Sequence, residues 1–397
     1  MTLRTSILDN KANILIPPTH APSIKRIVRE PFRRYRQMDR SIPQEVVNAF
    51  REPSRLAELP ERTWSELIPW IRRTGLEGEV AALCEAFGEC LPEGVRDQLE
   101  ASRRLVKRQN QLITNEIREL QEVLEGRVST VLLLKGAAYL ALGLPNAASR
   151  ISSDIDLMVP RHELESTEQC LIDAGWEAVP RSVYDQHYYR DWMHEIPPLR
   201  HRERGTFVDL HHAITPPVSR LRIPSEPLFD AMRPVPGSGF HVLSPPDMVL
   251  HSACHLLSDG EFSHGLRDFR DIHLLVEHFG CADPDFWRAL AARASEFRLE
   301  RTLFYTVSFL EQSFGTGFPS AFRRHVGALA PPRPVHVLMD AAIRHAVLPA
   351  VPARFGDRLA ENLMIARSHY LRMPLHLLVP HLVRKSLLRV RKARSPT

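Results

Sequence analysis

The pattern of apolar and polar residues changes twice along the chain. Between about Pro43 and Glu125 apolar residues recur mostly at helical spacing, and Gly126 supplies a helix stop signal. We therefore predict an N-terminal helical lobe over residues 41–128, preceded by a basic, partly ordered arm at residues 1–40. In the longest polar stretch the apolar positions are Leu99, Leu105, Leu112, Ile117, Leu120 and Leu124.

Short strands and helices alternate from Ser129 onward. An apolar run ends at Lys135 and Gly136 and is followed by the helical segment AAYLALGLP. The segment ISSDIDLMV then alternates in the manner of a strand, a helical segment ends at Gly175, and FVDLHH follows as a third strand. The order strand, helix, strand, helix, strand predicts an α+β unit, which we place at residues 129–240.

The rest of the chain has a predominantly helical pattern. Pro245, Pro246 and Asp247 supply a helix start, and helical spacing continues from there. We predict a C-terminal helical domain over residues 241–380 and a basic tail at residues 381–397.

Charge is distributed unevenly between the tail and the body of the protein. Eight Lys or Arg residues and no acid follow Glu361, so the net charge of +5 leaves residues 1–361 at −3. A negatively charged body disfavours binding of a long polyanion such as a nucleic acid, whereas the basic tail remains compatible with one. No apolar run reaches membrane-spanning length and no secretory signal is present, so we expect a cytoplasmic protein.

Cysteine usage predicts neither a disulfide framework nor a zinc knuckle. The residues are odd in number, scattered, and without C-x-x-C spacing. They are Cys84, Cys90, Cys170, Cys254 and Cys281.

Three aspartates form the constellation with the most complete chemistry. Asp154 and Asp156 are two residues apart in a strand pattern, so both leave one face, and Asp209 lies in the next strand pattern along the chain. Such carboxylates can hold two divalent cations that bind a triphosphate and activate a hydroxyl nucleophile. The alternative is that these residues are turn or cap residues.

The segments around these aspartates resemble a known family. The series KGAAYL, RISSDIDLMV, a helix ending in DAGW, and FVDLHH resembles the uncharacterised bacterial branch of the polymerase-beta-like nucleotidyltransferase superfamily. The resemblance covers about residues 130–215 and extends more loosely over residues 246–278. It implies a small mixed-sheet nucleotidyltransferase domain flanked by helical regions, with the metal carboxylates on adjacent strands.

The resemblance also implies a role for individual residues. Asp154 and Asp156 would be metal ligands, and Asp209 a third ligand that also acts as base for the acceptor hydroxyl. Gly136 would lie where the superfamily's Gly-Ser turn meets the triphosphate, although Ala137 stands here in place of that serine.

Two cations are candidates to replace the missing hydroxyl as phosphate ligands. Lys135 follows the first strand directly, and Arg150 precedes Asp154 by four residues. The alternatives are a strand-end lysine in solvent and an arginine in an ion pair.

Three histidines are further candidates. His211 shares a face with Asp209 and is a candidate to orient the metal ligands or the acceptor, or else an ordinary strand-end histidine. His251 and His255 have the i, i+4 spacing of a metal pair, but no Glu follows the first one as in H-E-x-x-H, so packing of their helix is favoured over a zinc site.

The sequence thus favours a metal-dependent nucleotidyltransferase. It would use two Mg²⁺ ions, or Mn²⁺ in their place, to transfer a nucleotidyl group from an NTP to an unknown acceptor with release of pyrophosphate. The acceptor is a small molecule, a protein or a nucleic acid. Two alternatives stay open: a catalytically silent binding module with this fold, and a membrane-associated accessory protein of envelope or polysaccharide assembly, whose basic tail contacts an anionic membrane surface.

Overall fold

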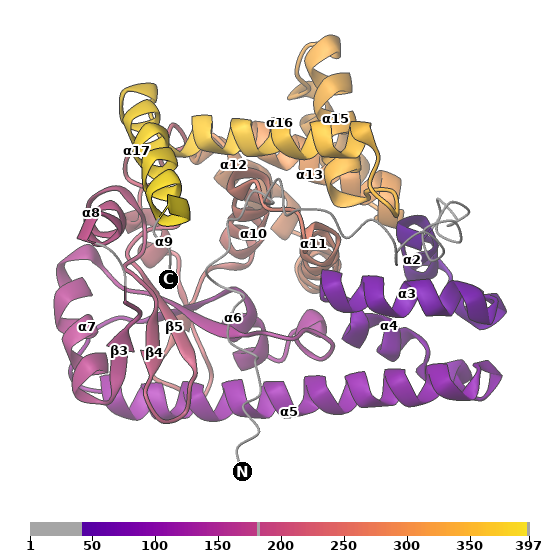
Figure 1. The fold of residues 1–397 in the computed structure, drawn as a ribbon, viewed down its shortest axis with the longest axis horizontal. Coiled ribbons are helices and arrows are strands. Elements are labelled where there is room, and N and C mark those ends of the chain that lie inside the picture. The colour runs from indigo at the N-terminus through magenta and orange to yellow at the C-terminus, as the bar shows by residue number, and fades with distance from the viewer. Residues whose placement is uncertain (1–41, 181–182, 395–397) are drawn as a thin grey trace. The chain divides into compact units, whose positions relative to one another are not determined.

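The computed structural model describes residues 42–180 and 183–394, so the basic arm predicted at residues 1–40 lies outside it. The fold is α+β, as predicted: one mixed sheet is flanked by helices (Figure 1). The described residues belong to one compact unit by their contacts. The division of this unit at residues 128, 240 and 380 stays a prediction.

The first part of the described chain is helical, which confirms the predicted pattern there. Trp64 and Trp70 are almost fully buried and anchor these helices to each other. The helix over Glu61–Thr74 ends at Gly75, whose positive φ of 70° is the left-handed conformation that glycine adopts most easily. The elements are α2 (Ile42–Arg51), η2 (Pro53–Glu58), α3 (Glu61–Thr74), α4 (Glu77–Leu83), η3 (Glu85–Cys90) and α5 (Glu93–Leu124).

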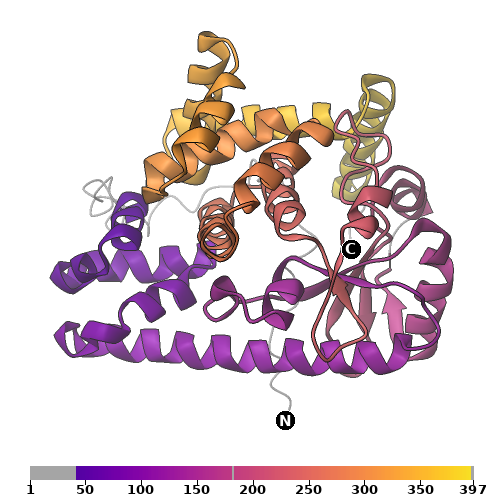
Figure 2. The same ribbon diagram turned by 180° about the vertical axis from the view of Figure 1, so that it is seen from behind.

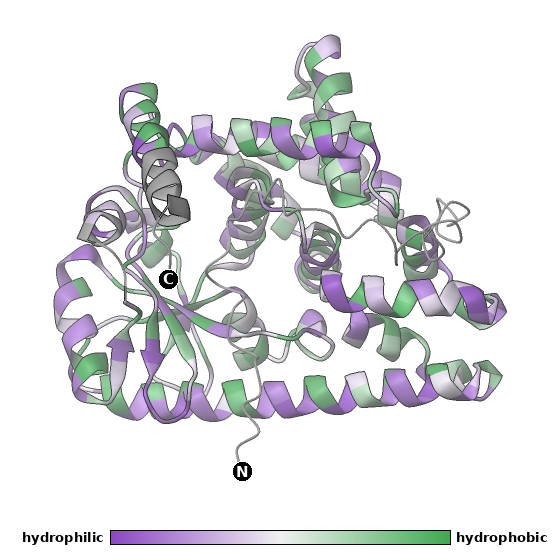
Figure 3. Cartoon of the chain, in the orientation of Figure 1, coloured by the Kyte–Doolittle hydropathy of each residue, from purple (hydrophilic) through white to green (hydrophobic). Residues whose placement is uncertain are grey.

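Helix α5 buries most but not all of the predicted apolar positions. Those that are buried as expected are Leu99, Ile117, Leu120 and Leu124. Leu105 and Leu112 are 52% and 39% exposed, whereas Val106 and Ile113 are buried. A step of one residue turns the side chain by about 100° around the helix, so only one of two neighbouring positions can face the protein. Figure 3 accordingly shows separate apolar bands on a mainly hydrophilic helix.

Among the described residues, seven strands form one sheet in the order β3-β4-β5-β2-β1-β7-β6. The pairs β2–β5 and β1–β7 are parallel, and the others are antiparallel. The middle strands β5, β2 and β1 carry the residues with predicted chemistry. The strands are β1 (Leu132–Leu134), β2 (Asp154–Met158), β3 (Trp176–Ala178), β4 (Leu199–His201), β5 (Phe207–His211), β6 (Arg233–Pro234) and β7 (His241–Val242).

The segment between the second and third predicted strands has more structure than the sequence pattern indicates. It forms β3 and β4, an antiparallel pair in which Trp176 and Leu199 are fully buried. These strands have three residues each, too short to give a periodic signal. The helices between β1 and β6 along the chain are α6 (Lys135–Ala141), η4 (Pro145–Ala147), η5 (Arg161–Glu163), α7 (Leu164–Asp173), α8 (Val183–Trp192) and α9 (Glu226–Asp230).

The C-terminal part is helical, as predicted, and α10 contacts α11, α12, α13 and α16 (Figure 2). Helix α10 begins at the predicted Pro245, and Arg293 binds both carboxylate oxygens of Asp247 in its first turn at 2.7 and 2.9 Å. Within the described residues, no helix is both long and apolar enough to cross a membrane. The helices are α10 (Pro245–Asp259), α11 (Gly265–Ala282), α12 (Phe286–Glu296), α13 (Glu300–Phe314), α14 (Ser320–Ala328), α15 (Arg333–Val347), α16 (Phe355–Arg372) and α17 (Leu375–Arg394).

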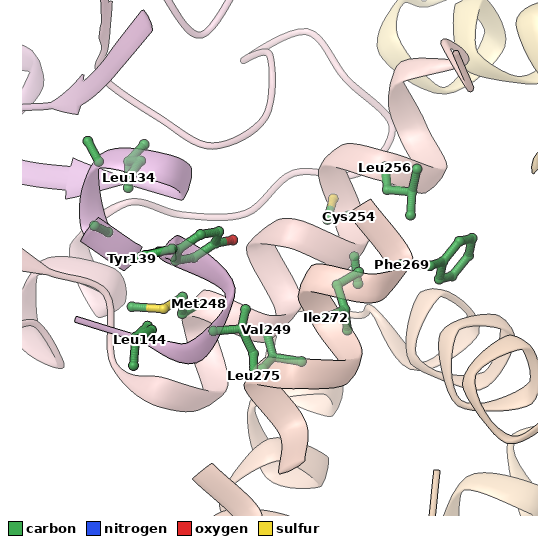
Figure 4. Close-up of a cluster of buried hydrophobic side chains, with 14 of the residues drawn as sticks. Leu134, Tyr139, Leu144, Met248, Val249, Cys254, Leu256, Phe269, Ile272 and Leu275 are labelled. Carbon is green, nitrogen blue, oxygen red and sulfur yellow. The ribbon is translucent and has the colours of Figure 1, made fainter. Parts of the chain in front are cut away.

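One apolar core runs from the sheet into these helices. Leu134 of β1 and Tyr139 of α6 belong to the same buried cluster as Met248 of α10 and Leu275 of α11 (Figure 4). Tyr139 also forms a 2.7 Å hydrogen bond with Ser252 of α10 through its hydroxyl group. The shared core therefore fixes α6 and the end of β1 against α10.

Candidate active site

The three predicted aspartates lie on two neighbouring strands. Strand β2 pairs in parallel with β5, and the register places Asp156 opposite Asp209 and Asp154 opposite Phe207. Opposed residues of a parallel pair point to the same face, and successive residues alternate between faces. Asp154, Asp156 and Asp209 therefore project from one face of the sheet, and the expected adjacency of their strands is confirmed.

Asp156 is the most buried of the three and contacts two basic groups. Its Oδ1 atom lies 3.0 Å from Lys135 Nζ and 3.0 Å from His211 Nε2. The exposed fraction of the side chain is 9% for Asp156, 19% for Lys135 and 2% for His211. A carboxylate is thus held between an ammonium group and an imidazole, largely away from water.

The electrostatics of this trio favour the charged forms. Burial acts against each charge, but attraction by Lys135 and the hydrogen bond from His211 outweigh it and hold the pKa of Asp156 well below its usual value. Burial is likewise outweighed at Lys135, where attraction by Asp156 and Asp154 raises the pKa of the ammonium group. At His211 the hydrogen bond to Asp156 raises the imidazole pKa against the effect of burial.

The backbone at the start of α6 is strained, and it determines where Lys135 lies. Lys135 has a φ of 46°, in the left-handed region that residues with a side chain rarely adopt, at a cost of about 1 kcal/mol or more. The next residue is Gly136, and a β-carbon there would lie only 2.2 Å from Ser152 Oγ, so a larger residue would force this serine side chain to move. The junction therefore brings the end of β1 and the segment before β2 into close approach.

Arg150 has acidic partners on α11. Its Nη1 atom contacts the carboxylate of Asp271 and lies 3.7 Å from Asp268 Oδ1. The guanidinium carbon is 5.9 Å from the ring centre of Tyr139. The arginine is largely buried, so these contacts join the segment before β2 to α11, and its nucleotide-binding role stays a prediction.

Two further residues with metal-binding side chains lie beside His211. His194 and Glu195 follow α8, and the ligand atoms of His194, Glu195 and His211 all lie within 4.8 Å of one another. Burial, reinforced by repulsion from His211, holds the pKa of His194 well below its usual value, which leaves this imidazole neutral at pH 7. No pattern along the sequence points to His194 or Glu195, because they lie in an irregular segment whose only signal is the His-Glu dipeptide itself.

His251 and His255 face the same charges from α10. Burial, followed by repulsion from Lys135, lowers the pKa of His251 to about 3 and that of His255 well below its usual value. Their rings are 6.4 Å apart between centres. Both are therefore neutral in the folded protein at pH 7.

A comparison with protein families supplies independent evidence. The model of a family described as "Uncharacterised nucleotidyltransferase" matches residues 60–315, which is more than half of the chain. The chain belongs to this nucleotidyltransferase family. Searches of curated proteins and of solved structures found no match.

The family match covers every element of the site in this nucleotidyltransferase. It runs from the start of α3 to the end of α13 and contains Lys135, the three aspartates and the His194–His211 region, and it supports transferase activity. Helices α14 to α17 lie outside the match. The family match does not identify the substrates of the transferase.

Proposed function

We propose that this nucleotidyltransferase transfers a nucleotidyl group from a nucleoside triphosphate to an acceptor, with release of pyrophosphate, in a polymerase-beta-like active centre. The register that sets Asp156 opposite Asp209 carries this proposal. This register brings the carboxylates of Asp154, Asp156 and Asp209 to one face of two adjacent strands. A chain without a bound cation has little reason to bring such charges together, because like charges repel.

The donor set fits the predicted metal ions. Mg²⁺ prefers oxygen ligands such as carboxylates, and Asp154, Asp156 and Asp209 supply them. The negative field of the cluster already stabilises cations, since it raises the pKa of both Lys135 and His211 against burial. Two Mg²⁺ ions, with Mn²⁺ as a substitute, would neutralise the triphosphate and polarise its α-phosphorus.

The reaction requires one bond to form and one to break. An oxygen of the acceptor bonds to the α-phosphorus while the bond from that phosphorus to the oxygen of the leaving pyrophosphate breaks. The proton of the acceptor hydroxyl passes to the carboxylate of Asp209, which acts as general base. Lys135, beside the carboxylates, supplies positive charge to the phosphates.

Gly136 and Arg150, the other predicted residues, position the site in this scheme. Gly136 permits the close packing of the Lys135 junction against Ser152. Arg150 holds the segment before β2 to Asp271 and so supports the position of Asp154. The acceptor is a small molecule, a protein or a nucleic acid, and the described residues do not choose among them.

The test is to incubate the purified chain with each α-³²P-labelled NTP, a cell extract and Mg²⁺, and to identify what becomes labelled. We expect label transfer that is lost on chelation and in Asp154→Asn, because an amide cannot anchor a divalent ion as a carboxylate does. The matched control is Asp173→Asn, which changes an exposed aspartate at the end of α7 and should transfer label normally. NTP binding by calorimetry without any transfer would instead support a silent binding module.

A further inference from the structure

A second group of potential metal ligands lies at the edge of the aspartate site, on two paired chain segments. Glu195 and His211 are opposed in an antiparallel bridge, and the backbone N–H of His212 donates to the carbonyl oxygen of His194 at 2.9 Å. Directly opposed residues have β-carbons only about 5 Å apart. The backbone itself therefore holds these side chains near one another, on the strand that carries Asp209.

The distances within the group are close to those of a metal centre. His211 Nε2 lies 3.5 Å from Glu195 Oε2, and the rings of His194 and His211 are 5.3 Å apart between centres. With all ligand atoms within 4.8 Å, only small side-chain rotations are needed to place them about 2.1 Å from a shared ion.

His194 also has an unsatisfied nitrogen atom. Its Nδ1 atom is buried and has no hydrogen-bond partner among the described residues. A buried polar atom without a partner costs about 1–3 kcal/mol. A metal bond is one way in which an imidazole nitrogen recovers that cost.

We propose that His194, Glu195 and His211 form a site for a divalent transition metal ion of the zinc class. Two imidazoles and one carboxylate are the ligand set of many zinc centres, whereas Mg²⁺ prefers oxygen ligands alone. Glu195, rather than the Asp154–Asp156 pair, supplies the carboxylate ligand. The metal bond of His211 Nε2, which lies 3.5 Å from Glu195 Oε2, replaces the hydrogen bond of this nitrogen to Asp156 Oδ1. The inference goes beyond nucleotidyl transfer and does not depend on it.

The test is calorimetric titration of the metal-free full-length chain with ZnCl₂, without nucleotide. We expect one zinc ion per chain, bound equally well in excess Mg²⁺, and a zinc-dependent rise in the melting temperature. His194→Gln and Glu195→Gln should each weaken zinc binding by about tenfold or more. Unfolding curves in chelator establish that each variant folds. If His194→Gln does not fold, the zinc affinity of Glu195→Gln, which preserves the shape of the side chain, tests the proposal.

Two control histidines make the result specific. His273→Gln changes a buried histidine that bonds Thr316 Oγ1 at 2.8 Å, and it should leave zinc affinity unchanged. His255→Gln examines the alternative pair on α10 and should have little effect. Absence of stoichiometric zinc binding, equal competition by Mg²⁺, or an equal loss in His255→Gln would each overturn the proposal.

A further variant separates this proposal from the proposed function. Asp154→Asn should lose nucleotidyl transfer and keep its zinc affinity, because Asp154 is not in the ligand group. A chain that transfers label but binds no zinc would refute this site alone, and one that binds zinc but never transfers label would refute the proposed function alone.

Discussion

Lys135, at the junction of β1 with α6, forms a largely buried ion pair with Asp156 of β2, with 3.0 Å between Nζ and Oδ1. The two residues are 21 positions apart in the sequence, so the pair connects the start of α6 to the strand that carries Asp154 and Asp156. A second basic group, His211, contacts the same oxygen atom. This arrangement makes the effect of a substitution depend strongly on which member is changed.

We expect Lys135→Met to raise the KM for the NTP by about tenfold and to lower the free energy of unfolding by about 1–3 kcal/mol. The variant removes a cation from the phosphates and leaves Asp156 with one basic partner fewer. Steady-state kinetics and urea unfolding measure the two effects. Lys107→Met, at an exposed lysine of α5, is the control and should change neither.

Asp154→Asn and Asp156→Asn should differ in stability although both abolish transfer. Asp156→Asn leaves buried Lys135 and His211 without their shared carboxylate, at a cost of about 3 kcal/mol. Chemical denaturation of the two variants compares them directly, and equal stability would show that the ion pair contributes little.

Stability should fall as the pH is lowered from 7.5 to 5.0, in part through His273. Burial, reinforced by repulsion from Arg270, lowers its pKa to about 3, although Glu277 Oε2 lies 3.3 Å from its Nε2 atom. The unfolded chain therefore binds a proton below about pH 6.5 that the folded chain does not, which favours unfolding by at most about 2 kcal/mol at pH 5. His273→Gln cannot titrate, so its unfolding free energy should depend less on pH than that of the wild type.

The cysteines should fall into separate classes of reactivity. Burial raises the pKa of Cys84 to about 12 and that of Cys254 to about 11, and the thiolate is the reactive form. Cys90 and Cys281 are exposed. We expect a thiol reagent to modify the exposed pair rapidly at pH 7.5 and the buried pair only in denaturant, as peptide mapping after timed labelling would show.

We further propose that α17 contacts an anionic membrane surface. Leu375, Val379, Leu382 and Val383 have helical spacing and are each at least 41% exposed, and no acid lies among the basic residues that follow. Each cation near such a surface contributes about 1 kcal/mol. Salt-sensitive binding to anionic but not neutral liposomes is expected.

The liposome experiment needs two variants, because α17 also contacts the body. Tyr184 of α8 hydrogen-bonds His381 at 2.8 Å, so truncation after Pro380 removes this contact as well as the cations. Val379→Ser combined with Val383→Ser keeps the contact and the charges and should weaken binding. If both variants bind anionic vesicles as the full chain does, the helix is not a membrane contact.

The sequence determined those features that depend on the direction of neighbouring side chains. Alternation with a period of two placed Asp154 and Asp156 on one face of a strand, and the Pro245 start signal located α10. The same local information failed for β3 and β4, which are too short to show a period. It also could not choose between Leu105 and Val106 on α5, because both fit a helical pattern and only the neighbouring elements decide which is buried.

The tertiary structure alone decided which distant residues meet. Parallel pairing of β2 with β5 set Asp156 opposite Asp209, the bridge between Glu195 and His211 joined an irregular segment to β5, and packing of α11 gave Arg150 a partner 121 residues away. These contacts depend on strand register and helix packing, which bury one apolar core shared by the whole unit. A period along the chain records the face on which a side chain lies, but it holds no information on what packs against that face.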